Sequence, residues 1–111
     1  MSDGSSGNGG RLIEPVPSDI PPRIDDCGVL RYRGAWTALS PTQEAVLRTL
    51  VNRFGEPVSR TAITAEVWPD GGADRHTIDI HIHRLRPRLR AIGLVIHTLR
   101  GRGFLLEGST D

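Results

Sequence analysis

At 111 residues the chain is long enough for one small domain, and its single cysteine excludes an internal disulfide and favours a reducing compartment. No apolar run approaches the roughly 20 residues that span a bilayer, and the first residues lack the basic and apolar regions of a signal peptide, so we expect a cytoplasmic protein. The formal net charge is only +1, but residues 31–103 hold 12 arginines against 6 acidic residues while both ends are acidic, which indicates a polyanionic partner for the folded part.

Residues 1–23 are rich in glycine, serine and proline and show no apolar periodicity. This composition is typical of a disordered tail or a linker. We expect one folded domain over residues 24–108 and a short disordered end over residues 109–111.

The folded part begins with three short predicted strands, over Arg23–Asp26, Val29–Tyr32 and Ala35–Leu39. Arg33 and Gly34 supply the turn between the last two strands. On that hairpin Tyr32 and Trp36 are expected to lie near each other and to pack together.

Two helices follow, each with a clear start. Ser40 is a predicted N-cap, with Pro41 at the first helical position and Gln43 placed to complete a capping box. The apolar face of this helix is expected to comprise Ala45, Val46, Leu47, Leu50, Val51 and Phe54. Gly55 ends it. Ser59 caps the second helix, predicted over Arg60–Trp68, whose inward residues are expected to be Ile63, Val67 and Trp68.

A third helix is predicted over residues 75–91, capped by Asp74 after a loop over Pro69–Ala73. Helical spacing places one apolar stripe toward the core, comprising Ile78, Ile82, Leu85, Leu89 and Ile92. The opposite face is cationic and rich in hydrogen-bond donors: it carries His76, Ile80, His83, Arg84 and Arg90, flanked by Arg86 and Arg88. Pro87 is expected to kink the helix or to end its regular part.

A hairpin closes the chain, with strands predicted over Leu94–Leu99 and Phe104–Leu106. Its turn, Arg100–Gly103, alternates arginine with glycine, so a turn that needs positive φ also carries two guanidinium groups at its tip. A helix that fits a major groove beside a cationic hairpin has the geometry of a winged helix.

Other chemistry finds little support in the residues. His81 and His83 are two residues apart and His76 and His83 seven apart, so no pair has the four-residue spacing of helical metal ligands. Ser59, Asp79 and His81 are the residue types of a hydrolase, but no nucleophile turn accompanies them. We therefore predict no catalytic residue, no metal site and no cofactor.

Cys27 lies beside Gly28 at a strand edge. It is expected to be a small packed residue, with a mixed-disulfide dimer as the alternative.

Five segments of the chain are informative in combination: Leu39–Glu44, Val58–Arg60, Glu66–Trp68, Thr77–Arg86 and Ile96–Phe104. In this order and spacing they resemble the OmpR/PhoB-type winged-helix DNA-binding domain, and the resemblance spans residues 24–107. It implies an α+β winged helix-turn-helix fold, in which a short N-terminal antiparallel sheet precedes three helices and a C-terminal β-hairpin wing. It also implies a transcriptional regulator that binds double-stranded DNA, with the recognition helix 75–91 in the major groove and the wing 99–104 at the minor groove.

The resemblance also implies which side chains contact DNA. Carried over by position, the candidate DNA-binding residues are Trp68, Arg75, His76, Ile80, His81, His83, Arg84, Arg86, Thr98, Arg100 and Arg102. Relatives commonly bind direct repeats as head-to-tail pairs, and a contact with RNA polymerase is a further expectation. The family usually carries an N-terminal receiver domain, and we expect none to form from the residues before Ile24.

The sequence departs from the family pattern in four places. His76 stands where the family usually has arginine, so a permanent charge is replaced by one that titrates near neutrality. Pro87 lies inside the recognition helix, and Phe104 replaces the usual tyrosine. The loop Pro69–Ala73 is short and lacks large apolar residues, which weighs against a polymerase contact made there.

Two rival interpretations concern the binding partner. Winged helices are also used as protein-interaction modules within larger regulators. The run Arg100–Gly103 superficially resembles RNA-binding RGG segments, although a single copy between two strands is better explained as a hairpin tip. Steep loss of affinity with salt distinguishes a DNA-binding domain from an apolar docking module.

Overall fold

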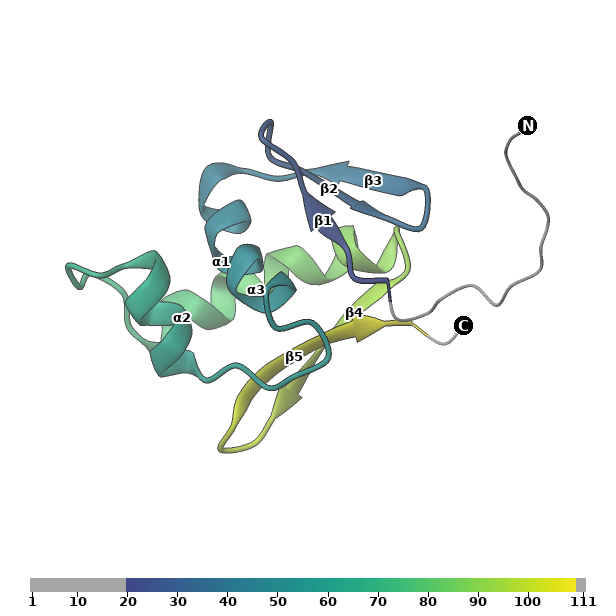
Figure 1. The fold of residues 1–111 in the computed structure, drawn as a ribbon. Helices are drawn as coiled ribbons and strands as arrows, with labels where there is room; N and C mark the ends of the chain where they lie inside the picture. The colour runs from purple at the N-terminus through teal and green to yellow at the C-terminus, as the bar shows by residue number, and fades with distance from the viewer. Residues whose placement is uncertain (1–19, 110–111) are drawn as a thin grey trace, which may run out of the picture.

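A computed structural model describes residues 20–109. These residues form, in chain order, β1 Arg23–Ile24, β2 Val29–Tyr32, β3 Ala35–Ala38, α1 Pro41–Val51, α2 Arg60–Val67, α3 Arg75–Arg90, β4 Leu94–Leu99 and β5 Gly103–Gly108. Figure 1 shows the N-terminal sheet at one end of the helices and the β4–β5 hairpin projecting at the other. The predicted α+β winged-helix fold is confirmed. The predicted tail over residues 1–23 lies almost wholly outside the described residues, as does most of the predicted end over residues 109–111.

The N-terminal sheet is antiparallel, in the order β1-β2-β3. The turn between β2 and β3 has positive φ at both central residues, 52° at Arg33 and 84° at Gly34, which is the turn type that matches strand twist in a two-residue hairpin. This turn pairs Tyr32 with Ala35 and places Trp36 on the other face. Tyr32 is buried and Trp36 is 62% exposed. The expectation that these two aromatic residues pack together was therefore wrong.

The turn from β1 to β2 is organised by Asp25, whose Oδ1 accepts hydrogen bonds from the backbone amides of Cys27 at 2.8 Å and Val29 at 3.0 Å. These bonds fold the chain back after Ile24, so the first strand is shorter than predicted. They also turn Cys27 to the surface, where it is exposed. The expectation of a packed cysteine was wrong for this reason.

The predicted starts of all three helices are confirmed. Ser40 and Gln43 form the capping box of α1, and Ser59 Oγ accepts from the Ala62 amide at the start of α2. Asp74 caps α3. Helix α2 ends at Val67, one residue before the predicted end. Trp68 is its C-cap and has left the helical conformation, with φ -128° and ψ 65°.

Helix α3 runs through Pro87 to Arg90 as one element, so the expectation that Pro87 could end the helix was wrong. Pro87 removes one backbone hydrogen bond. Leu89 and Ile92, which follow it, are both buried in the core and hold the last turn in place. The Arg88 guanidinium also donates to the Ala38 carbonyl at 3.2 Å, which ties this turn to the end of β3.

The core lies between the three helices, the N-terminal sheet and the inner face of the hairpin (Figure 1). The predicted stripe of α3 is confirmed, since Ile78, Ile82, Leu85, Leu89 and Ile92 are all buried. The remaining buried apolar residues are Leu30, Tyr32, Val46, Leu47, Leu50, Val58, Ile63, Leu94, Ile96, Phe104 and Leu106. Every helix and strand contributes a fully or partly buried apolar residue to this core by its regular spacing, and the contribution of β3 is Ala35, which packs at the edge of the core.

The hairpin is joined to the body through the segment before α2. Val58 and Phe104 exchange two backbone hydrogen bonds, of 2.7 and 2.9 Å. Gly103 makes this approach possible, because a Cβ there would overlap the Val58 carbonyl. Among residues 20–109 no helix is long and apolar enough to cross a membrane.

Candidate nucleic-acid interface

The face of α3 opposite its buried stripe is open to solvent. His76, Ile80, His83, Arg84 and Arg90 are all exposed, as the helical spacing predicted. Ile80 is 37% exposed and is one of three exposed large hydrophobic residues in the described chain. No hydrogen bond or ion pair within residues 20–109 engages the His83 or Arg84 side chain. This face therefore offers free donors around one aliphatic side chain.

The start of this helix is fixed by Asp74. Its Oδ1 accepts hydrogen bonds from the Thr77 amide at 2.9 Å and the Thr77 hydroxyl at 3.0 Å. The backbone hydrogen bond from Thr77, followed by that from its side chain, lowers the pKa of the Asp74 carboxyl below its ordinary value. A carboxylate at a helix N-terminus also complements the helix dipole. Asp74 therefore determines where the exposed face of α3 begins, two residues before His76.

One arginine of α2 forms an ion pair with α3. Arg60 Nη2 lies 2.7 Å from Asp79 Oδ1 of α3. The same guanidinium lies over the Phe104 ring of β5, 4.7 Å from its centroid. Arg60 thus contacts α3 and the hairpin at once. Sequence reasoning missed this residue, because a pair 19 positions apart gives no periodic signal.

A second contact between the two helices joins two predicted DNA-binding residues. The Trp68 indole and the His81 imidazole lie with their centroids 5.8 Å apart and their planes tilted by 31°. Both side chains are half-buried. The two rings therefore pack against each other at a tilt and stay partly exposed.

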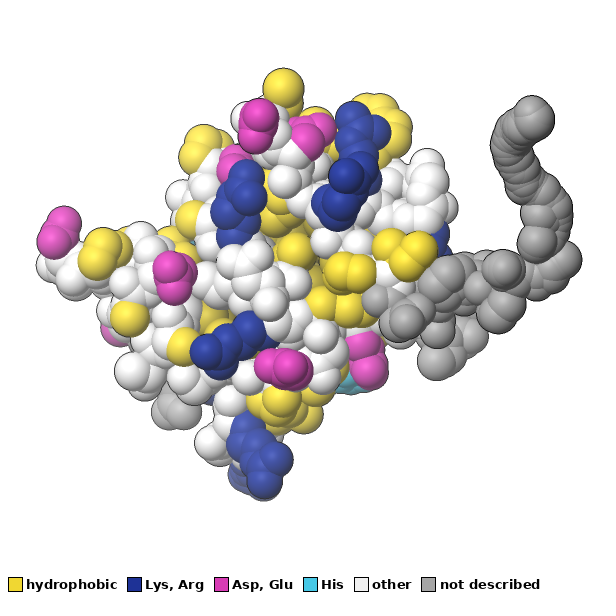
Figure 2. Space-filling view, viewed as in Figure 1, with side chains coloured by type: hydrophobic (Ala, Val, Ile, Leu, Met, Phe, Trp, Pro, Cys, Tyr) yellow, Lys and Arg dark blue, Asp and Glu magenta, His cyan; other side chains and the backbone are white. Residues whose placement is uncertain are grey.

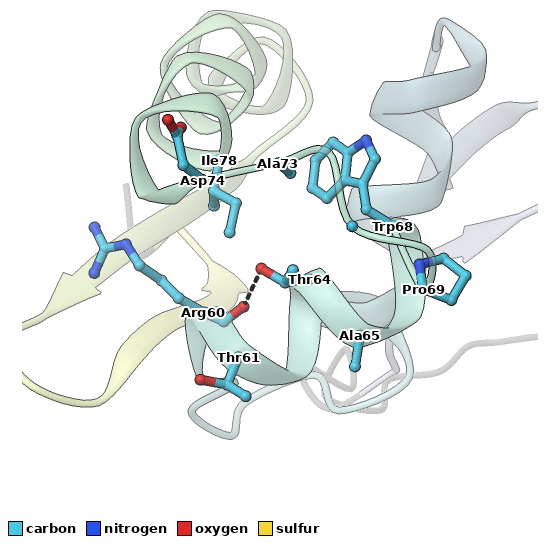
Figure 3. Close-up of a pocket in the computed structure, with 10 residues that line it drawn as sticks. Arg60, Thr61, Thr64, Ala65, Trp68, Pro69, Ala73, Asp74 and Ile78 are labelled. Atoms are coloured by element: carbon cyan, nitrogen blue, oxygen red, sulfur yellow. Dashed lines mark hydrogen bonds between the residues drawn. The ribbon is translucent and has the colours of Figure 1, made fainter.

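Trp68 also borders an open groove of about 450 Å³ between α2 and the beginning of α3. Figure 3 shows Ile78 of α3 and the N-cap residue Asp74 on one side of this groove and the α2 side chains Thr61, Thr64 and Ala65 on the other. The Thr64 hydroxyl donates to the Arg60 carbonyl at 2.8 Å, so its hydrogen bond stays within α2.

Arg86 and Thr98, both predicted to contact DNA, contact each other. Arg86 Nη2 donates to Thr98 Oγ1 at 2.7 Å and to the Ile96 carbonyl at 3.1 Å. This pairing joins α3 to β4 across 12 positions and was not predicted, because nothing in the sequence marks it.

The tip of the hairpin carries Arg100 and Arg102, both exposed as predicted. The turn is closed by a 2.9 Å hydrogen bond from the Arg102 amide to the Leu99 carbonyl, with Gly101 at φ 74°. Figure 2 shows basic side chains at this end of the hairpin, away from the body. Within residues 20–109 no acidic group pairs with either guanidinium. Of the eleven predicted residues only the Arg75 side chain lies outside the described part of the chain.

Known proteins share this sequence pattern. The sequence model of the family described as "Transcriptional regulatory protein, C terminal" matches residues 34–106. The transcriptional regulatory protein TctD of Salmonella typhimurium is 36% identical over 83 residues, which cover 74% of this chain and 37% of TctD. The chain thus spans little more than a third of that relative.

Solved structures share the fold. The C-terminal domain of the nisin resistance regulator NsrR, a lantibiotic response regulator, superposes with a TM-score of 0.66 at 31% identity, covering 78% of this chain and 90% of that domain. The DNA-binding domain of Klebsiella pneumoniae RstA, solved in complex with the RstA box, gives a TM-score of 0.62 at 25% identity, covering 78% of this chain and 91% of that domain.

The matched family is one of transcription regulators and is not a class of enzymes. Its model covers β3, the three helices α1 to α3, β4 and most of β5. By sequence and by fold, the chain belongs to the OmpR/PhoB-type family of winged-helix transcriptional regulatory domains.

Proposed function

We propose that this chain binds double-stranded DNA sequence-specifically as the DNA-binding part of a transcriptional regulator, with α3 in the major groove and the wing at the adjacent minor groove. The observation that carries the proposal is the exposed face of α3, where Arg84 and His83 have no partner within residues 20–109 and surround Ile80. A helix fits the width of the B-DNA major groove, and its free donors meet acceptors on base edges there. Family membership supports the same assignment.

The proposed roles follow from what each side chain offers. Arg84 can donate two parallel hydrogen bonds to a guanine, and Ile80 can contact a thymine methyl group. His76, His83 and Arg75 are assigned to the groove or its phosphates. Trp68 and His81 are assigned to the sugar-phosphate backbone, because both side chains are partly exposed.

At the other end, Arg100 and Arg102 are assigned to the minor groove and its phosphates. A guanidinium with no protein partner keeps all of its donors for phosphate. Arg86 and Thr98 are not assigned to DNA, because they are bonded to each other.

Selection from a random duplex library tests the proposal directly. The purified chain is expected to enrich one motif, and its affinity for that motif is expected to fall steeply with salt. A library that shows no enrichment, with affinity insensitive to salt, would contradict DNA binding and favour a protein-interaction module. No catalytic role belongs to this proposal. We place the activity in the cytoplasm, where a regulator reaches the chromosome.

Head-to-tail pairing on direct repeats is a further part of the proposal. It is supported by Trp36, which is 62% exposed and is paired in register with Arg31 on the outer face of the N-terminal sheet. Cooperative binding to two adjacent copies of the selected motif, reduced in Trp36→Ala, would support it; equal binding by both proteins would contradict it. Contact with RNA polymerase stays a prediction of the family resemblance. The loop Pro69–Ala73 has no large apolar side chain besides Pro69, which weighs against a polymerase contact made by this loop.

A further inference from the structure

The Arg86 side chain extends from α3 toward the wing. Its Nε and Nη2 atoms both donate to the Ile96 carbonyl, at 3.3 and 3.1 Å, and Nη2 also donates to Thr98 Oγ1 at 2.7 Å. In residues 20–109 these are all the hydrogen bonds that join α3 to β4. One planar guanidinium therefore connects the recognition helix to the strand that leads into the wing tip.

The other strand of the wing has a separate anchor. β5 is held by the pair of backbone hydrogen bonds between Phe104 and Val58, supported by the close approach at Gly103. A two-stranded hairpin is marginally stable on its own. The base of the β4–β5 hairpin is held by its buried residues Leu94, Ile96, Phe104 and Leu106, and β5 is also bonded to Val58 and Gly55. At β4 the side-chain tie to α3 is Arg86, and the exposed tip of the hairpin is residues 100–102.

We infer that Arg86 is a positioning residue, which holds the wing at a fixed angle to the recognition helix and does not itself contact DNA. The inference rests on the proposed DNA binding, because it explains how α3 and the wing engage two grooves together. Binding at two places is strongest when the free protein already holds both at the right separation, since no ordering then opposes association.

The contrast with Arg84 supports this assignment. Arg84 lies two positions earlier in α3, roughly 200° around the helix, where it is exposed and unpartnered within the described chain. Arg86 is half-buried. Moving its guanidinium to a phosphate would break three hydrogen bonds and leave the Ile96 carbonyl, on a buried residue, without its side-chain donor.

Amide hydrogen exchange of the free protein tests the anchor without DNA. Arg86→Lys keeps the charge but lacks the planar fork, so it is expected to expose the amides of β4 and β5 to exchange about tenfold faster. Arg86→Ala is expected to do the same. Arg84→Ala is the matched control, expected to leave the wing unchanged, and protection of the core helix α1 is expected to stay the same in all three variants.

A double-mutant cycle on the selected duplex tests the consequence. If Arg86 acts by placing the wing, Arg86→Ala removes most of what Arg100 contributes. The Arg86→Ala, Arg100→Ala double variant is then expected to bind within about threefold of Arg86→Ala alone. Its slope of log affinity against log salt should equal that of Arg86→Ala. In the Arg84→Ala, Arg100→Ala double variant the fold losses in affinity of the two single variants are expected to multiply, since those two side chains act independently.

Two results would overturn the inference. One is a double variant whose fold loss in affinity is the product of the losses in Arg86→Ala and Arg100→Ala, with each substitution lowering the salt slope by about one unit. That result would identify Arg86 as a direct phosphate contact. The other is wing exchange that does not change in Arg86→Lys and Arg86→Ala. If the wild-type chain selects no duplex at all, the proposed function fails. The hydrogen-exchange comparison then still tests whether Arg86 holds the wing to α3.

Discussion

Asp79 Oδ1 accepts a 2.7 Å hydrogen bond from Arg60 Nη2, and this ion pair joins the two helices of the helix-turn-helix across 19 positions of sequence. The Arg60 side chain is 24% exposed, and its Nε has no partner in the described structure. The guanidinium is thus largely withdrawn from water. Its pairing with Asp79 offsets part of the cost of that burial.

Removing the carboxylate should therefore destabilise the domain. Asp79→Ala is expected to lower the free energy of unfolding by about 1 kcal/mol, measured by urea denaturation. Asp79→Asn keeps an acceptor oxygen and should cost less. Asp70→Ala, in the exposed loop before α3, is the control, and an equal effect of Asp70→Ala and Asp79→Ala would argue against the role given to the pair.

The exposed face of α3 gives a prediction about specificity. Arg84→Ala should weaken binding to the selected duplex by about 1–3 kcal/mol and relax the preference at one base pair, because a bidentate base contact is lost. Its melting temperature should be unchanged, since Arg84 has no partner within residues 20–109. Arg53→Ala, after α1, serves as the control in the same titration. Unchanged affinity for Arg84→Ala, or a melted domain, would count against this assignment.

The wing arginines should act through the phosphate backbone. Arg100→Ala and Arg102→Ala are each expected to weaken specific and non-specific duplexes and to flatten the salt slope by about one unit per lost contact. If Arg100 enters a minor groove, its loss should matter most on A·T-rich flanks, where that groove is narrow and most negative. Titration at several salt concentrations measures both effects, and parallel slopes for all three proteins would show that the wing does not touch DNA.

His76 should make binding depend on pH. A protonated imidazole adds a positive charge opposite phosphate, so affinity is expected to rise as pH falls through the neutral range. The positive end of the α3 dipole opposes this charge and should limit the effect. Affinity measured across that range should vary less in His76→Gln than in the wild type. The same pH profile for both proteins would rule out a phosphate contact by His76.

Asp74 predicts a different pH dependence, in stability at acid pH. Its pKa is lowered in the folded protein, mainly by the Thr77 backbone hydrogen bond, so the carboxylate stabilises the fold above the unfolded pKa. That contribution should be lost as pH falls below about 4, through the folded pKa. Asp74→Ala should therefore be less stable than wild type at pH 7 and approach it in acid. A stability difference independent of pH would exclude the charged cap as its source.

The residue types close to each helix and strand were sufficient to predict where most of these elements lie. Ser40, Ser59 and Asp74 mark helix starts because a cap acts within three residues, and Gly101 marks the wing turn because it permits positive φ. The buried stripe of α3 and its exposed opposite face followed from helical spacing alone. The expectation that Tyr32 and Trp36 pack together was wrong, because the two-residue turn places them on opposite faces of the hairpin.

Tertiary structure decided which of the candidate side chains are free to reach a partner. Arg84 and Arg86 are the same residue type on one helix, yet one is exposed and the other is bonded to β4, because the fold brings Ile96 and Thr98 to only one of them. Helix α3 likewise continues past Pro87 because Leu89 is buried against distant elements. Such contacts join positions far apart in the chain, and local propensity carries no information about them.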